Sequence, residues 1–462
     1  MLCLPGIVLL VAFIYVRPQE VYTGLQALPL LYIFLGLAVF GAVVDVKLGF
    51  LRLRGTVQHQ VAIAFLGWCT LTIALRAPWY LTAGLRDIMI PASLFFLLAF
   101  GVQTFRTLEV FVASLLALVL FLSYIGVDQG LNDSVCHMVD WREGSQTGIP
   151  DGRPCETPRG CEQGEGAVAG ADYLCEKPGM LNTHSIGRGR VRYRGILEDP
   201  NELSLAGCVA IPFAFAFFER KKSTMRTLLL LGTIGIVGLC TVFSQSRGGQ
   251  VVFLTATGVY FIRRFGWRGI LIGAALAAPM LLFGGRSGEE ADSSAEERTM
   301  CLYVGMQMFR QSPLIGVGQG QFVEHHILTA HNSYVLTAAE LGLPGMTLWV
   351  LLLYVSMKIP VSALRQAAAG DIELAPVARA WGVALAASLT GMFVGIFFLS
   401  FAYHDVLWIA LGLTGAYQAS VRVHEPRFDV SLNWREIAAV AAFCTVLVVL
   451  ITVYAGYKVS HP

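Results

Sequence analysis

The feature that most constrains this chain is a series of apolar runs, each about 20 residues long, that recurs along the whole sequence. Hydrophobic residues make up 55% of the 462 residues and charged residues only 14%, which excludes an ordinary soluble domain. A run of this length crosses the hydrocarbon layer as a helix, because a helix satisfies its own backbone hydrogen bonds there. The sequence therefore predicts an all-α, polytopic membrane helical bundle.

We expect 12 to 13 spans, and the thirteen candidates cover about residues 2–16, 27–46, 57–76, 88–104, 108–127, 200–218, 227–244, 248–262, 269–284, 333–357, 379–400, 404–420 and 436–456. The first run is expected to be retained, because no A-x-A-like cleavage site follows it. The spans form transmembrane regions over 1–127, 200–284 and 333–462. Two long polar segments, 128–199 and 285–332, separate them.

Basic residues are distributed unevenly around these runs. With the N-terminus inside, the loops assigned to the cytoplasm hold 17 Lys and Arg, whereas the short external loops and tail hold 4. The cytoplasmic set is Lys47, Arg52, Arg54, Arg106, Arg220, Lys221, Lys222, Arg226, Arg263, Arg264, Arg268, Lys358, Arg365, Arg379, Arg422, Arg427 and Arg435. Because such residues concentrate on the cytoplasmic side, this asymmetry predicts that both long polar segments face the periplasm.

The first external segment carries four cysteines among Gly, Pro and charged residues: Cys136, Cys155, Cys161 and Cys175. In an oxidising compartment they are expected to form disulfides, and the sequence does not choose among the three possible pairings. Four free thiols are the alternative. No C-x-x-C spacing supports zinc ligation, so no metal is expected.

This segment ends in an arginine cluster just before a span: Arg188, Arg190, Arg192 and Arg194. One interpretation is attraction to lipid headgroups, or pairing with Glu198 and Asp199. The other is that Arg192 or Arg194 binds a diphosphate, since a planar guanidinium matches phosphate oxygens bidentately. The following Pro200-Asn201 predicts the first turn of a helix.

The sequence SQSRGG turns the chain around at the outer surface. Arg247 precedes Gly248 and Gly249, which permit close backbone approach, and Ser244 and Ser246 add hydroxyl groups beside the cation. The alternative is an Arg247 that only snorkels to the interface.

The second external segment combines an acidic run, Arg298 and a glycine-rich turn. The acidic residues are more typical of a solvated loop than of a metal site: Glu289, Glu290, Asp292, Glu296 and Glu297. Arg298 opens an amphipathic stretch. The sequence GVGQG at 316–320 predicts a tight turn and lacks the strand-turn-helix context of a phosphate-binding loop.

At 331–345, HNSYVLTAAELGLPG places a His331-Asn332 pair at the start of a span, on the same predicted side as Arg247. A neutral imidazole can accept a hydroxyl proton. Glu340 would lie ~13.5 Å along a regular helix from His331 and on the opposite face, so we expect no dyad. Instead we expect Glu340 to pair with a cation or hydroxyl of another helix. Weaker candidates for catalysis are His325, His326 and His404.

Four patches, in this order and spacing, resemble the O-antigen ligase and polymerase superfamily of bacterial envelope enzymes: RYRGILEDPNELS, SQSRGG, Arg298 before SPLIGVGQGQF, and HNSYVLTAAELGLPG. The resemblance covers about residues 190–345. It implies a membrane glycosyltransferase of the GT-C type in the inner membrane that uses undecaprenyl-diphosphate-linked glycans at the periplasmic face, without cofactor or metal. It also implies roles for Arg247, Arg298 and His331 in diphosphate binding and catalysis.

The chemistry of such a transfer agrees with these residues. Outside the cytoplasm there is no nucleotide supply, so the donor must arrive already activated in the membrane. Departure of its diphosphate builds negative charge that arginines can stabilise. His331 would take the acceptor's proton in an inverting displacement. Secondary candidates are Ser246, Asn332 and Glu340.

Two other classes compete with this hypothesis. A transporter or flippase of lipid-linked glycans should show broken helices near the bilayer midplane and related halves, and the sequence shows no matching halves. An assembly subunit would leave Arg247 and His331 unexplained. Within the enzyme class the acceptor stays open among lipid A core, a growing polysaccharide and a protein hydroxyl, the last being protein O-glycosylation. Nucleic acid is not an expected partner.

Overall fold

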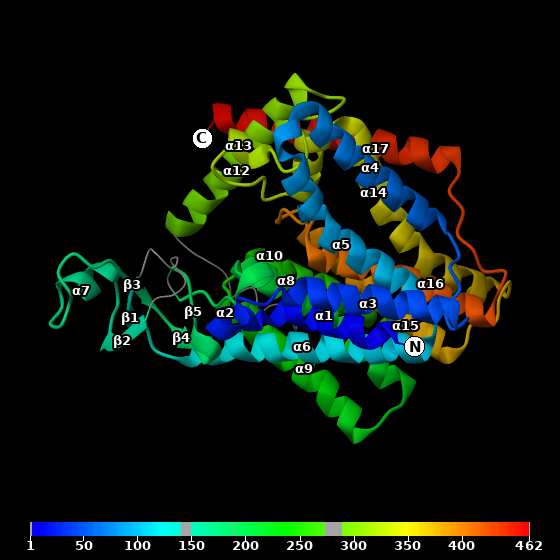
Figure 1. Cartoon of the computed structure of the whole chain (residues 1–462), viewed down its shortest axis with the longest axis horizontal. Coiled ribbons are helices and arrows are strands. Elements are labelled where there is room, and N and C mark those ends of the chain that lie inside the picture. Colours follow the sequence, from blue (N-terminus) through cyan, green and yellow to red (C-terminus); the bar gives the residue numbers. More distant parts are fainter. Residues whose placement is uncertain (1, 140–148, 188, 272, 274–288, 462) are drawn as a thin grey trace. The chain divides into compact units, whose positions relative to one another are not determined.

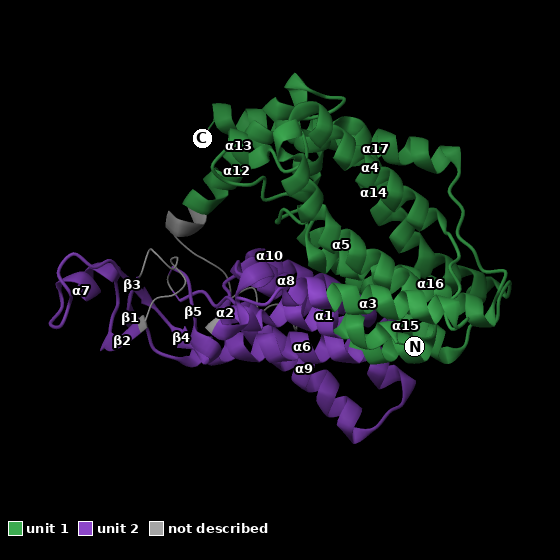
Figure 2. Ribbon diagram, viewed as in Figure 1, with its two compact units in different colours: residues 1–8, 34–112, 287–462 green, residues 9–33, 113–286 purple. Residues whose placement is uncertain are grey.

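A computed structural model describes residues 2–139, 149–187, 189–271, 273 and 289–461. Helices dominate the described residues (Figure 1), which confirms the predicted helical bundle. They form two compact units, shown in Figure 2: unit 1 comprises residues 1–8, 34–112 and 287–462, and unit 2 comprises residues 9–33 and 113–286. The two units are described separately below.

Unit 1 packs around large buried aromatic rings. Helices α5 (Leu81–Gly101) and α16 (Asp405–His424) lie side by side (Figure 1), and α14 (Ser333–Ala369) packs against α4 (Val57–Arg76). Trp349, Trp381 and Trp408 are fully buried, and rings of this size dominate the energetics of a core. The unit also contains η2 (Pro78–Tyr80), α12 (Glu289–Gln311), α13 (Phe322–His325), α15 (Pro376–Gly395) and α17 (Trp434–Ser460).

Unit 2 is centred on α8 (Pro200–Arg220), which packs against α9 (Thr224–Phe243) and α10 (Arg247–Phe265). Helix α8 begins where the sequence predicts it. The Asp199 carboxylate accepts a hydrogen bond from Asn201 N at 2.6 Å, with Pro200 in the first turn. Helices α1 (Cys3–Val16), α3 (Leu30–Lys47) and α6 (Phe105–Leu131) are divided between the units. Shorter helices of unit 2 are α2 (Pro18–Val21), η1 (Thr23–Leu25), α7 (Pro158–Gln163), η3 (Met180–Asn182) and η4 (Gly195–Leu197).

Ten helices of the described residues are long and apolar enough to cross a membrane. They match ten of the thirteen candidate spans. Two other candidates, 248–262 and 404–420, do form helices, α10 and α16, but these are not among the ten. The candidate 269–284 lies almost wholly outside the described residues. The chain is therefore a multi-pass membrane protein.

The described part of residues 128–199, the segment predicted to be external, contains short strands joined by disulfides. The sheet order is β2 (Ile149–Pro154), β1 (Val135–Met138), β3 (Tyr173–Glu176), all antiparallel, and a second sheet pairs β4 (Pro178–Gly179) with β5 (Thr183–His184). The four cysteines form two bonds, Cys136–Cys161 and Cys155–Cys175, a pairing that the sequence left open. Cys136 and Cys161 are buried with Tyr173 in a small local core.

Candidate functional site

The start of α14 holds the His331-Asn332 pair in a defined geometry. Asn332 is the N-cap: its Oδ1 accepts hydrogen bonds from Tyr334 N at 2.9 Å and Val335 N at 3.0 Å, and its Nδ2 donates to Phe397 O at 3.1 Å. His331 precedes the cap with φ +47°, in the left-handed region that residues with a Cβ seldom adopt. The half-buried imidazole is thus carried by a backbone that the surrounding contacts must hold in place.

Ser333 supplies much of that support. Its N donates to Ile396 O at 2.9 Å, its hydroxyl donates to Leu399 O at 2.6 Å, and the same oxygen accepts from Phe401 N at 2.7 Å. These bonds tie the first turn of α14 to the turn between α15 and α16. We did not single out Ser333 from the sequence, although its place directly after His331-Asn332 could have drawn attention to it.

Helix α14 is broken at Gly342 (φ +67°, ψ −176°), about two and a half turns after it starts at Ser333. A break leaves carbonyls without their usual donors, and Pro344 has no N–H to offer. The glycine-rich turn and α4 supply substitutes. Val317 N donates to Ala339 O at 3.0 Å, Gly318 N to Glu340 O at 2.9 Å, and the Trp68 indole N–H to Leu341 O at 2.9 Å.

The glycines of this turn are required by close approach. A Cβ on Gly316 would lie 2.2 Å from the carbonyl carbon of Glu340, and Gly316, Gly318 and Gly320 all have positive φ. The predicted tight turn is present, and it packs closely against α14.

Glu340 belongs to the same arrangement. Its side chain is 2% exposed, and Oε1 accepts a hydrogen bond from Phe322 N at 3.0 Å. We expected a cation or a hydroxyl of another helix as partner; besides this main-chain N–H, the Tyr403 hydroxyl, in the turn directly before α16, interacts with the Glu340 carboxylate. Glu340 therefore fastens the end of the glycine-rich turn to α14, which favours a structural role over a place in the substrate pocket.

Arg298 lies on α12 in the same unit. This helix packs against α14 at Gly305, where an added Cβ would lie 2.5 Å from Val335 Cγ1. Arg298 is half-buried and two turns away, roughly 10 Å along α12. The side chains of Glu289, Glu290 and Asp292 lie outside the described residues, whereas Glu296 and Glu297 are exposed, as a solvated stretch would be.

The other predicted histidines of unit 1 are placed differently. His404 caps α16, with Nδ1 accepting from Val406 N at 3.2 Å and the ring stacked on Phe401 at 3.9 Å between centroids. His326 Nδ1 lies 3.1 Å from Leu328 O, and His325 is exposed. These local contacts explain His326 and His404 without a catalytic role.

In unit 2 the SQSRGG turn caps α10. The Ser246 hydroxyl accepts from Gly249 N at 2.9 Å and donates to Asn201 Oδ1 at 2.7 Å, at the start of α8. Ser246 is thus a buried structural residue, and Asn201 is a partner that the sequence did not reveal. An added Cβ on Gly249 would lie 2.5 Å from Ser204 Cβ, so the glycine at this position allows α8 to pack closely against α10. Arg247, directly after the cap, is exposed.

The arginine cluster of unit 2 is mostly turned to the protein. Arg194 is 9% exposed and its guanidinium donates to Glu20 O at 2.8 Å and Leu181 O at 2.6 Å. Burial lowers the pKa of Arg194. Arg192 is 6% exposed; its Nε donates to His184 O at 3.2 Å and a guanidinium nitrogen lies 4.0 Å from Glu198. Arg188 lies outside the described residues. The geometry favours structural roles for Arg192 and Arg194.

His331, Asn332, Arg298 and Glu340 thus belong to unit 1, and Arg247, Ser246, Arg192 and Arg194 belong to unit 2. Of these, His331 and Arg298 are half-buried and Arg247 is exposed, and they remain the candidates for contact with a substrate. All three lie within the part of the chain to which a known family corresponds.

Comparison with known families matches residues 232–350 to the O-antigen ligase family. No curated protein matches the chain. The matched residues include the start of α10, the second external segment and the first half of α14, so the resemblance predicted from the sequence is confirmed there. The chain is a multi-pass membrane protein whose residues 232–350 match the O-antigen ligase family, a match that supports the resemblance to the O-antigen ligase and polymerase superfamily.

Proposed function

We propose that this protein transfers a glycan from an undecaprenyl-diphosphate-linked donor to an acceptor hydroxyl at the periplasmic face of the inner membrane. The observation that carries the proposal is the start of α14. There a left-handed His331 is held by the capping bonds of Asn332 and by three bonds of Ser333. Strained backbone retained in this way is typical of functional sites.

In this mechanism the acceptor oxygen attacks the anomeric carbon as the bond from that carbon to the diphosphate oxygen breaks. His331 takes the proton of the acceptor hydroxyl, and the electron pair leaves with undecaprenyl diphosphate. Arg247 and Arg298 bind the diphosphate and stabilise its growing charge. Attack from the face opposite the leaving group inverts the configuration. Asn332 and Ser333 position the base.

The reaction class is tested with purified protein in liposomes that contain a lipid-linked glycan labelled in the sugar. We expect release of undecaprenyl diphosphate and labelled acceptor in equal amounts. Movement of the labelled donor between leaflets without a new glycosidic bond would instead identify a transporter. Offering a lipid A core, an oligosaccharide and a hydroxyl-bearing protein in parallel identifies the acceptor.

The membrane side is tested through the two disulfides. An impermeant thiol reagent applied to spheroplasts should label Cys155 and Cys175 only after reduction, because the proposed topology exposes residues 128–199 to the periplasm. Labelling without reduction would contradict the disulfides, and failure to label after reduction would contradict the orientation. The six cysteines that form no disulfide are buried and serve as an internal control.

A further inference from the structure

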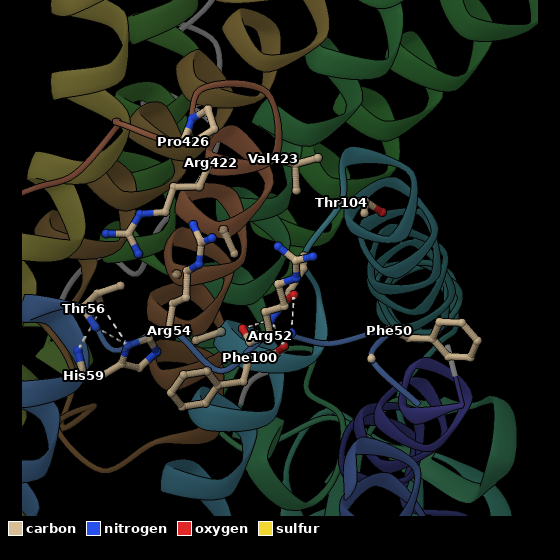
Figure 3. A pocket seen from close by; sticks show the side chains of 15 residues that line it. Phe50, Arg52, Arg54, Thr56, His59, Phe100, Thr104, Arg422, Val423 and Pro426 are labelled. Carbon is tan, nitrogen blue, oxygen red and sulfur yellow. Dashed lines mark hydrogen bonds between the residues drawn. The ribbon is translucent and has the colours of Figure 1, made fainter. Parts of the chain in front are cut away.

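A second polar site lies at the end of unit 1 that is opposite to His331. It is a cavity of about 390 Å³, lined by the segment before α4 and by the ends of α5 and α16 (Figure 3). The turn before α16 bonds to Ser333, near His331, so α16 begins at the same end of the unit as His331. Arg422 lies 18 residues after His404, the cap of α16, which is a rise of roughly 27 Å along the helix. The cavity is therefore separate from the proposed catalytic site.

The lining of this cavity is strongly cationic. Arg52, Arg54 and Arg422 contribute guanidiniums, and His59 contributes an imidazole. None of the described residues that line the cavity is an Asp or Glu. Figure 3 shows these basic side chains around one space. Arg422 also pairs with Asp429, whose side chain is largely exposed, so its charge is partly balanced. Arg52 and Arg54 are exposed and provide most of the available positive charge.

The walls of the cavity are held by hydrogen bonds. Arg52 N donates to Gln103 Oε1 at 3.1 Å, and Gln103 Nε2 donates to Arg52 O at 2.8 Å, so the segment before α4 is fixed to the end of α5. His59 Nδ1 accepts from Thr56 N at 3.1 Å, and its ring stacks on Phe100 at 4.2 Å. His59 is 4% exposed, and its Nε2 has no hydrogen-bond partner among the described residues.

Apolar side chains lie beside these arginines along the chain. Leu48, Phe50 and Leu53 are exposed by 58%, 59% and 63%. Alternation of exposed apolar residues with arginine is typical of a segment at a membrane surface, where acyl chains cover the former and phosphates bind the latter. A soluble anion would make no use of the apolar residues.

We propose that this cavity binds a phosphate group, and that its source is an anionic membrane lipid whose acyl chains lie against Leu48, Phe50 and Leu53. Guanidiniums of Arg52 and Arg54 bind the phosphate oxygens. Basic pockets between membrane helices at the cytoplasmic side are suited to such headgroups. On the predicted topology this end of unit 1 faces the cytoplasm, so the bound lipid belongs to the inner leaflet.

The test compares two double variants of the detergent-purified full chain. Arg52→Gln with Arg54→Gln removes two exposed charges from the cavity. Lys47→Gln with Arg427→Gln removes two exposed charges of the same predicted membrane side that do not line it. The thermal unfolding temperature is measured during titration with short-chain phosphatidylglycerol, short-chain phosphatidylcholine and inorganic phosphate.

We expect saturable stabilisation by phosphatidylglycerol, with an apparent Kd at least about tenfold weaker in the cavity variant and unchanged in the control variant. Equal weakening in both variants would indicate a general surface-charge effect and overturn the site. If inorganic phosphate stabilises the protein equally, the phosphate does not come from a lipid. If phosphatidylcholine stabilises it equally, the site has no preference for anionic lipid. Absence of saturable stabilisation overturns the proposal. None of these readouts depends on glycan transfer.

Discussion

Helices α10 and α14 begin with the same local arrangement, formed by different residues. Each is preceded by a left-handed residue, Gln245 (φ +52°) or His331 (φ +47°). Each has a polar N-cap whose side chain also bonds a neighbouring segment, Ser246 to Asn201 and Asn332 to Phe397. The candidate functional residue follows the cap in α10 and precedes it in α14.

This difference in position suits the two chemical roles. Arg247 lies in the first turn of a helix, where the aligned backbone N–H groups themselves attract an anion, and its long side chain can follow a bound phosphate. His331 lies outside the helix on a fixed left-handed backbone, which leaves its short side chain little freedom. A charged anchor tolerates mobility, whereas a general base must stay within hydrogen-bond reach of one proton.

The largest effect is expected for His331→Ala. Loss of a general base costs about 10²–10⁴ in rate, and donor binding should remain nearly intact because the arginines hold the diphosphate. Transfer and donor binding are measured separately with purified lipid-linked donor. His325→Ala, an exposed histidine of the same unit, is the matched control and should retain activity. Normal transfer by His331→Ala would remove the histidine from the mechanism.

The pH dependence of the transfer rate shows whether His331 acts as a neutral base or as a cation that binds phosphate. A base works as the neutral imidazole, so the rate should rise as pH increases through the range where an ordinary histidine titrates, about 6.5. If a protonated His331 bound phosphate, the rate and donor affinity would fall over the same range. Rates and binding from about pH 5 to 9 distinguish the two, and the histidine-dependent limb should disappear in His331→Ala.

A smaller effect is expected for Arg247→Lys. The charge is kept, but a point charge does not reproduce a bidentate phosphate contact, and the transfer rate should fall about 10²–10³-fold. Arg263→Lys changes an exposed arginine near the other end of the same helix and should leave the rate unchanged. Wild-type turnover by Arg247→Lys would show that Arg247 only anchors the helix at the membrane interface. It would then not take part in the reaction as His331 does.

The smallest effects are expected for the caps themselves. Asn332→Ala and Ser246→Ala should each lower the free energy of unfolding by about 1 kcal/mol, since each removes hydrogen bonds to helix N–H groups. Only Asn332→Ala should also reduce transfer strongly relative to this loss, because it releases the backbone beside His331. Asn332→Asp keeps the cap oxygen but loses the amide that donates to Phe397 O, so it should recover only part of the rate. A rate loss of equal size in both alanine variants would show that the caps act only through stability.

Some of these arrangements are readable from the sequence, and others are not. Pro200-Asn201, SQSRGG and His331-Asn332 each predicted a helix start, because capping depends on residues close together in the chain. A hydroxyl partner of Glu340 was expected, but its main-chain partner and those of the Gly316 turn were not predictable. They are main-chain groups more than fifteen residues away along the chain, and a main-chain donor leaves no mark on the sequence. The short strands around the disulfides were missed for a similar reason, since cross-links and not alternating patterns fix them.

The bonds between the glycine-rich turn and the break in α14 also limit where related sequences can carry insertions or deletions. Val317 and Gly318 hold Ala339 and Glu340, so the residues between them form a closed loop of fixed length that contains His331. An insertion or deletion inside this loop would shift the histidine or break the closure. Length changes should therefore be excluded between Gly318 and Ala339, a pattern that homologous sequences would record as a constant spacing.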